Sequence, residues 1–113
     1  DGTNIRDHIH VVDLAEAHVV ALERITSNDT SEACEGSHVG TGKGNSVIEV
    51  SESCERVSGG KRNYEIGDRR AGDVVAAYAD TKKANEVLGW KTQRSLDEAI
   101  ASAWAWEKKL RGL

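Results

Sequence analysis

The sequence predicts an α/β fold that is mostly helical, with short strands and an incomplete sheet. Two capping boxes, each a serine followed three residues later by a glutamate, begin predicted helices over 47–57 and 96–110. A repeat of apolar residues at helical spacing predicts a further helix over 12–25. The remaining strand-like segments are short and lie between helices, so a complete parallel sheet is not expected.

The first predicted helix has Asp13 near its start, where a carboxylate favours a helix. The polar stretch 26–32 that follows is expected to be a loop. Residues 35–40 could form a short strand, although the glycine and serine within them are poor strand formers.

The second predicted helix ends near residue 57 because Gly59 and Gly60 follow. Residues 63–66 suit another short strand. Asp80 is expected to cap a helix that ends at Gly89, since glycine is common at helix C-termini. The last helix, over 96–110, follows its capping box directly.

The composition fits one globular domain of 113 residues that buries about 60–70% of its unfolded surface. Hydrophobic residues make up 38% and charged residues 30%, and the chain has no Phe, Met or Pro. The large core side chains are therefore expected to include Trp90, Trp104 and Trp106.

Charge and cysteine content restrict the partners and the compartment. A net charge of −4 argues against nucleic acid, which needs a dense cationic face. No apolar run approaches the roughly 18 residues of a membrane span, so no membrane partner is expected. Cys34 and Cys54 have no metal-ligand spacing and predict a reducing, cytoplasmic location, with a disulfide as the alternative.

The most informative segment is Arg69-Arg70-Ala71-Gly72-Asp73, just before the apolar run 74–78. Guanidinium groups suit phosphate oxygens, and a carboxylate can accept hydrogen bonds from vicinal sugar hydroxyls. A second segment that begins with Arg6 and Asp7 lies near the other end of the chain. Together the two segments indicate a clamp for an anionic sugar nucleotide, against the alternative of surface salt bridges.

With both segments in view, nearly the whole chain resembles the C-terminal part of the UDP-glucose 4-epimerases (UDP-galactose 4-epimerases), which are extended short-chain dehydrogenases/reductases. The matching motifs are Asp1-Gly2-Thr3, Arg6-Asp7, Asp13-Leu14-Ala15, His18, Gly40-Thr41-Gly42, Asn45-Ser46-Val47, the Arg-Arg-x-Gly-Asp run with Tyr78-Ala79-Asp80, Leu88-Gly89-Trp90 and Ser95-Leu96-Asp97-Glu98.

The resemblance implies a substrate site for UDP-glucose and UDP-galactose. It assigns Arg6 and Arg70 to the UDP pyrophosphate and Asp73 to the ribose hydroxyls. Ala77 matches the position whose side chain limits the 2-substituent of the sugar, so its methyl group implies room for UDP-N-acetylhexosamines as well. The complete enzymes use tightly bound NAD to oxidise C4 and return the hydride to the other face of the 4-keto sugar, and they are compatible with a homodimer.

The resemblance also implies that residues 1–113 are a single C-terminal substrate-binding domain, without the N-terminal NAD-binding Rossmann domain. The chain enters a motif at Asp1 with no methionine, as a fragment would. We therefore expect no catalytic or cofactor-binding residues and no turnover from this chain alone. The alternatives are a non-catalytic UDP-sugar-binding or remnant module, and a fragment of a sibling dehydratase or decarboxylase.

Two motifs invite cofactor or catalytic roles that we do not assign. Gly40-x-Gly42-x-Gly44 precedes a helix, but its spacing is not that of the dinucleotide fingerprint, and a tight turn is the better interpretation. Tyr78 and Lys82 have the Tyr-x-x-x-Lys spacing of the superfamily's catalytic pair. The expected cap at Asp80 leaves the tyrosine outside the helix, so we do not assign the pair.

The histidines and several unusual positions receive structural interpretations. His8, His10 and His18 have no third ligand at a convincing spacing, so no metal site is predicted. Cys34, Gly36, Ser37 and His38 stand where the resembled family usually has a Tyr-x-x-x-Asn-type strand with large apolar residues. Ser53-Cys54 stands where an Ala-Phe pair is common, and Asp68 replaces a proline. Because a lost buried aromatic costs about 3–5 kcal/mol, these changes predict a loosely packed domain, with the segment 34–38 and the helix over 47–57 most affected.

Overall fold

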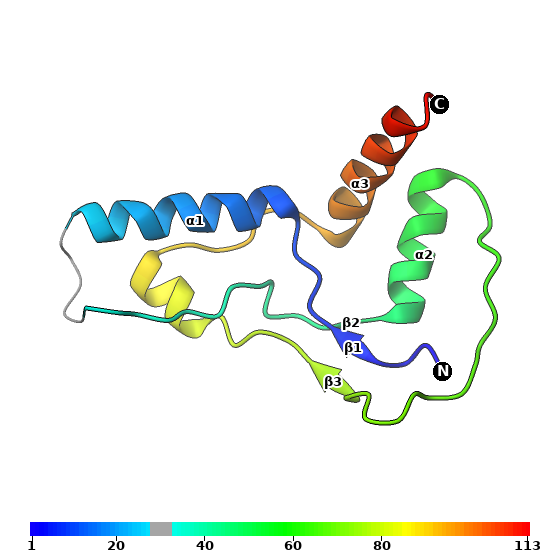
Figure 1. Cartoon of the computed structure of the whole chain (residues 1–113), viewed down its shortest axis with the longest axis horizontal. Helices are drawn as coiled ribbons and strands as arrows, with labels where there is room; N and C mark the ends of the chain where they lie inside the picture. Colours follow the sequence, from blue (N-terminus) through cyan, green and yellow to red (C-terminus); the bar gives the residue numbers. More distant parts are fainter. Residues whose placement is uncertain (28–32) are drawn as a thin grey trace.

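The computed structural model describes residues 1–27 and 33–113. A small sheet lies between two groups of helices (Figure 1). On one side a long helix lies against a short one, and on the other side two helices pack together. The elements are β1 (Ile5–Arg6), α1 (Val11–Thr26), β2 (Asn45–Ser46), α2 (Val47–Ser58), β3 (Ala76–Ala77), η1 (Ala84–Leu88) and α3 (Leu96–Leu110).

The three long helices confirm the sequence prediction to within a residue or two at each end. Both capping boxes form: Ser46 and Glu49 close the start of α2, and Ser95 and Glu98 close the start of α3. Gly59 ends α2 at a φ of 73°, a left-handed conformation that glycine adopts without strain. The predicted loop over 26–32 lies mostly outside the described residues.

The helix predicted between Asp80 and Gly89 forms with a different hydrogen-bond pattern. Asp80 Oδ1 accepts a hydrogen bond from the backbone N–H of Lys82, and Gly89 follows the last turn at a φ of 63°. Between them, η1 is a π-helix instead of an α-helix. Wide π-turns are inserted locally in helices, and the sequence pattern contains no separate signal for them.

The sheet differs from the prediction. Its strand order is β2-β1-β3, and β1 pairs antiparallel with β2 and parallel with β3. The strands predicted over 35–40 and 63–66 are wrong, because both segments lack ladder partners in the described chain. Each observed strand has only two residues, which is too short for an alternating pattern to reveal.

The hydrophobic core among the described residues is small. Trp90 is 5% exposed and packs with Ala17 and Ala84, with partly buried apolar neighbours around them. Trp104 and Trp106 are wrong as core predictions, since they are 39% and 58% exposed on α3. The accessible surface is 8247 Å², against about 6,100 Å² for a compact protein of this mass.

We therefore expect low thermal stability. The isolated chain should unfold below about 60 °C, since few apolar side chains are removed from water. Circular dichroism at 222 nm during heating measures the transition. A cooperative transition well above that temperature would contradict the prediction.

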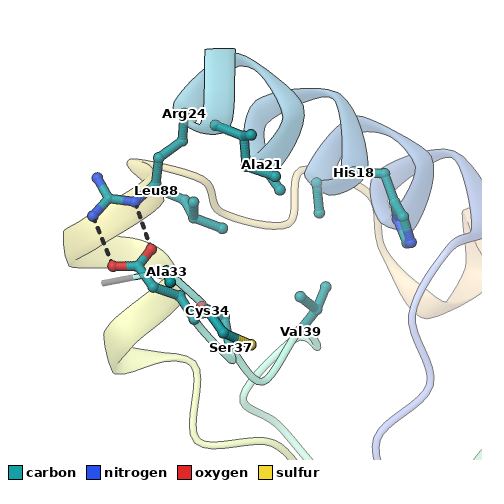
Figure 2. A pocket seen from close by; sticks show the side chains of 11 residues that line it. His18, Ala21, Arg24, Ala33, Cys34, Ser37, Val39 and Leu88 are labelled. Atoms are coloured by element: carbon teal, nitrogen blue, oxygen red, sulfur yellow. Dashed lines mark hydrogen bonds and ion pairs between the residues drawn. The ribbon is translucent and has the colours of Figure 1, made fainter. Parts of the chain in front are cut away.

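Two hollows lie beside residues at which the chain departs from its resembled family. One hollow, of about 450 Å³, lies between α1, Leu88 and the segment that contains Cys34 and Ser37 (Figure 2). At its edge Arg24 and Glu35 form a two-pronged ion pair of 2.9 and 3.1 Å. A second hollow, of about 600 Å³, lies between α2 and α3 and is lined by Cys54. Both cysteines are free.

The other departure in α2 has a structural explanation. Ser53 is fully buried, and its hydroxyl donates to the carboxylate of Asp97 in α3. Arg56 donates to the same carboxylate at 2.9 Å. Hydrogen bonds from both side chains lower the pKa of the Asp97 carboxyl, that from Arg56 more strongly. A polar contact at Ser53 thus joins α2 to α3.

Candidate sugar-nucleotide site

The central strand β1 holds Arg6 in a fixed position. One terminal guanidinium nitrogen donates to the carbonyl oxygens of Ile5 and Val74, each at 2.8 Å. The other donates to Asp73 Oδ1 at 2.8 Å. Because Val74 and Asp73 precede β3, these contacts fasten the Arg6 side chain across the two paired strands.

A tight turn brings Arg70 back onto Asp73. The backbone N–H of Asp73 donates to the Arg70 carbonyl oxygen at 3.3 Å. Gly72 stands third in this turn with a φ of 79°, as type II turns require. The spacing of the Arg-x-Gly-Asp run is thus explained by backbone geometry, and it places an Arg70 guanidinium nitrogen 3.5 Å from Asp73 Oδ2.

The structure brings together the three charged residues predicted from sequence. Arg6 and Arg70 both contact the carboxylate of Asp73, one on each oxygen. The Asp73 side chain is 19% exposed, while that of Arg70 is 86% exposed and can reorient. A hollow of about 170 Å³ is lined by Arg70 and Asp73 but not by Arg6. Arg69, which is paired with Asp1 at 3.2 Å, also lines it.

Ala77, the fourth predicted residue, lies beside Arg6 in the sheet. The parallel register of β1 and β3 pairs Arg6 with Ala77. Side chains at paired positions point to the same face of a sheet. The methyl group of Ala77 is exposed and lies on the face from which Arg6 projects.

A carboxylate that the sequence reasoning passed over holds this region together. Asp7 directly follows β1 and accepts hydrogen bonds from the backbone N–H groups of Thr41, Gly42 and Ala79, and from the Thr41 hydroxyl. A Cβ at Gly40 would lie 2.5 Å from the Asp7 carboxylate, so only glycine fits there.

The contacts of Asp7 also decide the role of the glycine loop. Its backbone N–H groups do bind an anion, and that anion is the carboxylate of Asp7. The loop therefore offers these donors to no cofactor phosphate. Burial raises the pKa of the Asp7 carboxyl, but the hydrogen bonds from Thr41, Ala79 and Gly42 outweigh it and hold the pKa below its usual value.

Replacing Asp7 with asparagine is expected to cost about 1–3 kcal/mol of unfolding free energy at pH 7, because an amide satisfies fewer of these donors. The folded pKa of Asp7 is depressed, so its contribution is complete above the unfolded value of about 3.9 and is lost as the pH falls through the folded pKa. Urea titrations at pH 7 and pH 3 should show the difference between wild type and Asp7→Asn shrinking. Asp68→Asn is the control, and an equal effect from it would contradict the assignment.

The histidines have separate positions. His10 caps α1, and its Nδ1 accepts a hydrogen bond from the backbone N–H of Val12. His18 is exposed and its Nδ1 is 2.7 Å from the Leu14 carbonyl oxygen. Among the described residues, no group of three acidic, histidine or cysteine side chains could hold a metal ion.

Tyr78 and Lys82 do not share a helix face. Tyr78 directly follows β3 and is 61% exposed, while Lys82 begins the helical stretch that continues into η1.

Within the described ranges, no helix is both long enough and apolar enough to cross a membrane.

The family model described as GDP-mannose 4,6 dehydratase matches residues 1–103. The chain belongs to this family. It is 46% identical over 107 residues to the UDP-glucose 4-epimerase of Bacillus subtilis, covering 95% of this chain and 31% of that relative. The resemblance stated from the motifs is confirmed.

Solved structures agree with the fold prediction. The UDP-glucose 4-epimerase of Bifidobacterium longum, in complex with NAD+ and UDP, has a TM-score of 0.81 and 42% identity over 96% of this chain and 31% of its own. The UDP-Glc/GlcNAc 4-epimerase of Campylobacter jejuni has a TM-score of 0.84 and 37% identity over 96% of this chain and 32% of its own. The chain thus spans about a third of the length of the relatives that it matches.

Proposed function

We propose that this chain is the UDP-sugar-binding portion of a UDP-glucose 4-epimerase. The observation that carries the proposal is the convergence of Arg6 and Arg70 on Asp73. Two guanidinium groups can hold a diphosphate through charge-assisted hydrogen bonds, and the carboxylate can accept from the ribose hydroxyls. The relatives named UDP-glucose 4-epimerase support UDP-glucose and UDP-galactose as the ligands.

The redox chemistry belongs to the remainder of a longer protein. When bound there, NAD would supply the hydride transfer at C4 of the sugar. This chain's glycine loop does not fit the cofactor's diphosphate, because Asp7 occupies its backbone donors. Residues 1–113 would hold and orient the sugar nucleotide in a cytoplasmic enzyme, and alone they would not catalyse the epimerisation. A homodimer of the complete enzyme stays a prediction.

Isothermal titration calorimetry with UDP, UDP-glucose and UDP-galactose tests the proposal on the chain itself. We expect all three to bind with similar affinity, since the clamp contacts the UDP moiety that they share. An assay for UDP-galactose formation should show no turnover, and the purified chain should lack nicotinamide absorbance. Absence of binding to every one of these ligands would contradict the proposal.

The two alternatives predict different results. A sibling enzyme would bind a different nucleotide, and a non-catalytic module would bind UDP-sugars without converting them. The family model bears the name of a GDP-mannose dehydratase, and a sibling dehydratase of that kind should prefer GDP to UDP. Competition between the two nucleotides in one titration distinguishes them. A non-catalytic or remnant module would bind UDP-sugars here, yet its full-length natural protein would show no epimerase activity.

Ala77 is expected to set the size limit at the sugar. Replacing Ala77 with tyrosine should weaken UDP-N-acetylglucosamine binding about tenfold or more while UDP binding is retained, because the ring fills the space of the N-acetyl group. Ala76→Tyr is the matched control, since the adjacent strand residue points to the opposite face. Equal losses in both variants, measured by calorimetry, would argue against this role.

A further inference from the structure

The hollow between α2 and α3 has no role in the proposed function. The two helices stand side by side (Figure 1), and the hollow between them has a volume of about 600 Å³. Pockets that bind small molecules have volumes of about 300–1,000 Å³. Among the described residues, this hollow shares none of its lining with the hollow at Arg70 and Asp73.

The side chains on the two helices explain why the space stays open. Ile100, Trp104 and Glu107 follow one another at four- and three-residue intervals, so they lie on one face of α3, and Ala103 adjoins them. The wall that α2 contributes contains Cys54. Because Ala103 and Cys54 are short, they leave the space unfilled, and Trp104 remains 39% exposed.

Two cations stand at the edge of this hollow. Lys61 and Arg62 line it from the segment that leaves α2. In the part of the chain that the structure describes, neither side chain has an ion-pair or hydrogen-bond partner; the backbone N–H of Arg62 donates to Glu55 Oε1 at 3.2 Å. Glu107, the only carboxylate among the described lining residues, already pairs with Arg111. The hollow therefore combines apolar walls with a net positive edge.

These features fit an aromatic carboxylate better than a neutral or a cationic compound. A flat ring can stack against the Trp104 indole, a favourable arrangement for aromatic groups. Its acid group can accept from the planar guanidinium of Arg62 and from the Lys61 ammonium. A cation would be repelled by both charges, and a neutral ring would leave both without a partner.

We propose that the hollow between α2 and α3 is a binding site for a small aromatic carboxylate. Trp104 and Ile100 hold the ring, and Lys61 and Arg62 hold the acid group. The site goes beyond the proposed function, since it uses none of the residues proposed to bind UDP-sugar.

Nuclear magnetic resonance titrations of the whole chain test the site with three naphthalene probes: 2-naphthoate, its neutral amide and 2-naphthylmethylamine. The carboxylate should bind at least about threefold more tightly than the amide, as expected for pairing with two exposed cations, and the amine should bind most weakly. This preference should shrink as the salt concentration rises to about 0.5 M, because added ions screen the charges.

The three tryptophans of the chain report where the probe binds. The indole N–H signal of Trp104, assigned with Trp104→Phe, should shift on addition of 2-naphthoate. The signals of Trp90, in the core, and of Trp106, which projects from the other side of α3, should stay in place.

A charge variant with a matched control tests the positive edge. Lys61→Gln combined with Arg62→Gln should bring the affinities for the carboxylate and the amide to within about twofold of each other. Lys82→Gln combined with Lys91→Gln removes the same charge away from the hollow and should keep the preference for the carboxylate.

A filling variant tests the walls. Cys54→Phe should weaken binding of 2-naphthoate at least about tenfold, because its ring would occupy the hollow. Cys34→Phe, which places the same ring beside α1, should bind the probe as the wild type does.

Three results for the wild type would overturn the inference: no binding of any probe, equal affinities for the carboxylate and the amide, or equal shifts of all three indole signals. The last would mean that a loosely packed chain takes up apolar anions at many places. Should circular dichroism show that Cys54→Phe is unfolded, the variant with Lys61→Gln and Arg62→Gln decides, since both side chains are exposed. An unchanged preference for the carboxylate in that variant overturns the inference.

Discussion

Replacing Asp13 with asparagine is expected to unfold a large fraction of the chain at 25 °C. Asp13 has no exposed surface, and its carboxylate accepts hydrogen bonds from the backbone N–H groups of Gln93 and Arg94 and from the Arg94 guanidinium at 2.6 Å. These contacts attach the start of α1 to the segment that leads into α3. An amide would leave buried donors unpaired, at a cost of about 3 kcal/mol.

Chemical denaturation with urea, followed by circular dichroism at 222 nm, measures this effect. The control is Glu16→Gln, because Glu16 also contacts Arg94, at 3.1 Å, but is 45% exposed. Exposed ion pairs contribute about 0–1 kcal/mol, so this control should be nearly neutral. Equal unfolding midpoints for the two variants would show that Asp13 is not the anchor.

The same carboxylate contributes to acid sensitivity. Burial raises the pKa of the Asp13 carboxyl, but the hydrogen bonds from Arg94 and Gln93 outweigh it, and the pKa lies below its usual value. Asp13 therefore stabilises the fold above the unfolded pKa of about 3.9, and this contribution disappears as the pH falls through the folded pKa.

Replacing Arg6 with alanine is expected to weaken UDP binding about tenfold to 100-fold. Charge-assisted hydrogen bonds account for this range, and Arg6 is the cation that the strand backbone already holds in place. Arg69→Ala is the control, because its guanidinium contacts Asp1 and Thr3 and does not contact Asp73.

Calorimetry with UDP compares the two arginine variants, and circular dichroism verifies that each remains folded. Arg69→Ala should bind UDP within about threefold of wild type, since it loses only an exposed ion pair. Equal losses in both variants would mean that the chain binds UDP by overall charge instead of by the clamp.

The helices were predictable because their signals are local. The pairs Ser46–Glu49 and Ser95–Glu98 lie within one turn, so the sequence alone predicts both helix starts and, with Gly59, one helix end. The strands were not predictable, because each has two residues and gains its partners only when distant segments meet. The convergence of Arg6 and Arg70 on Asp73 was expected because the chemistry of the two segments and the resemblance assign these residues to one site.

Asp7 and Asp13 show what sequence reasoning missed. Each carboxylate accepts backbone N–H groups from segments far away in the chain, such as Ala79 for Asp7 and Arg94 for Asp13. The sequence of a loop contains no pattern that predicts which of its backbone N–H groups will donate to a distant carboxylate. An acidic residue at the end of a strand or in the first turn of a helix, opposite a glycine loop or a helix entry, is the available signal.

The anchoring of Arg6 gives occupancy of the site a thermodynamic consequence. Its guanidinium spans β1 and β3 through the Val74 carbonyl oxygen and Asp73. A nucleotide bound there would engage the same group that fastens the strands, and the unfolded chain offers no such geometry. Because such a nucleotide would bind only the folded state, a higher nucleotide concentration would raise the folded fraction of this chain, whose hydrophobic core is small.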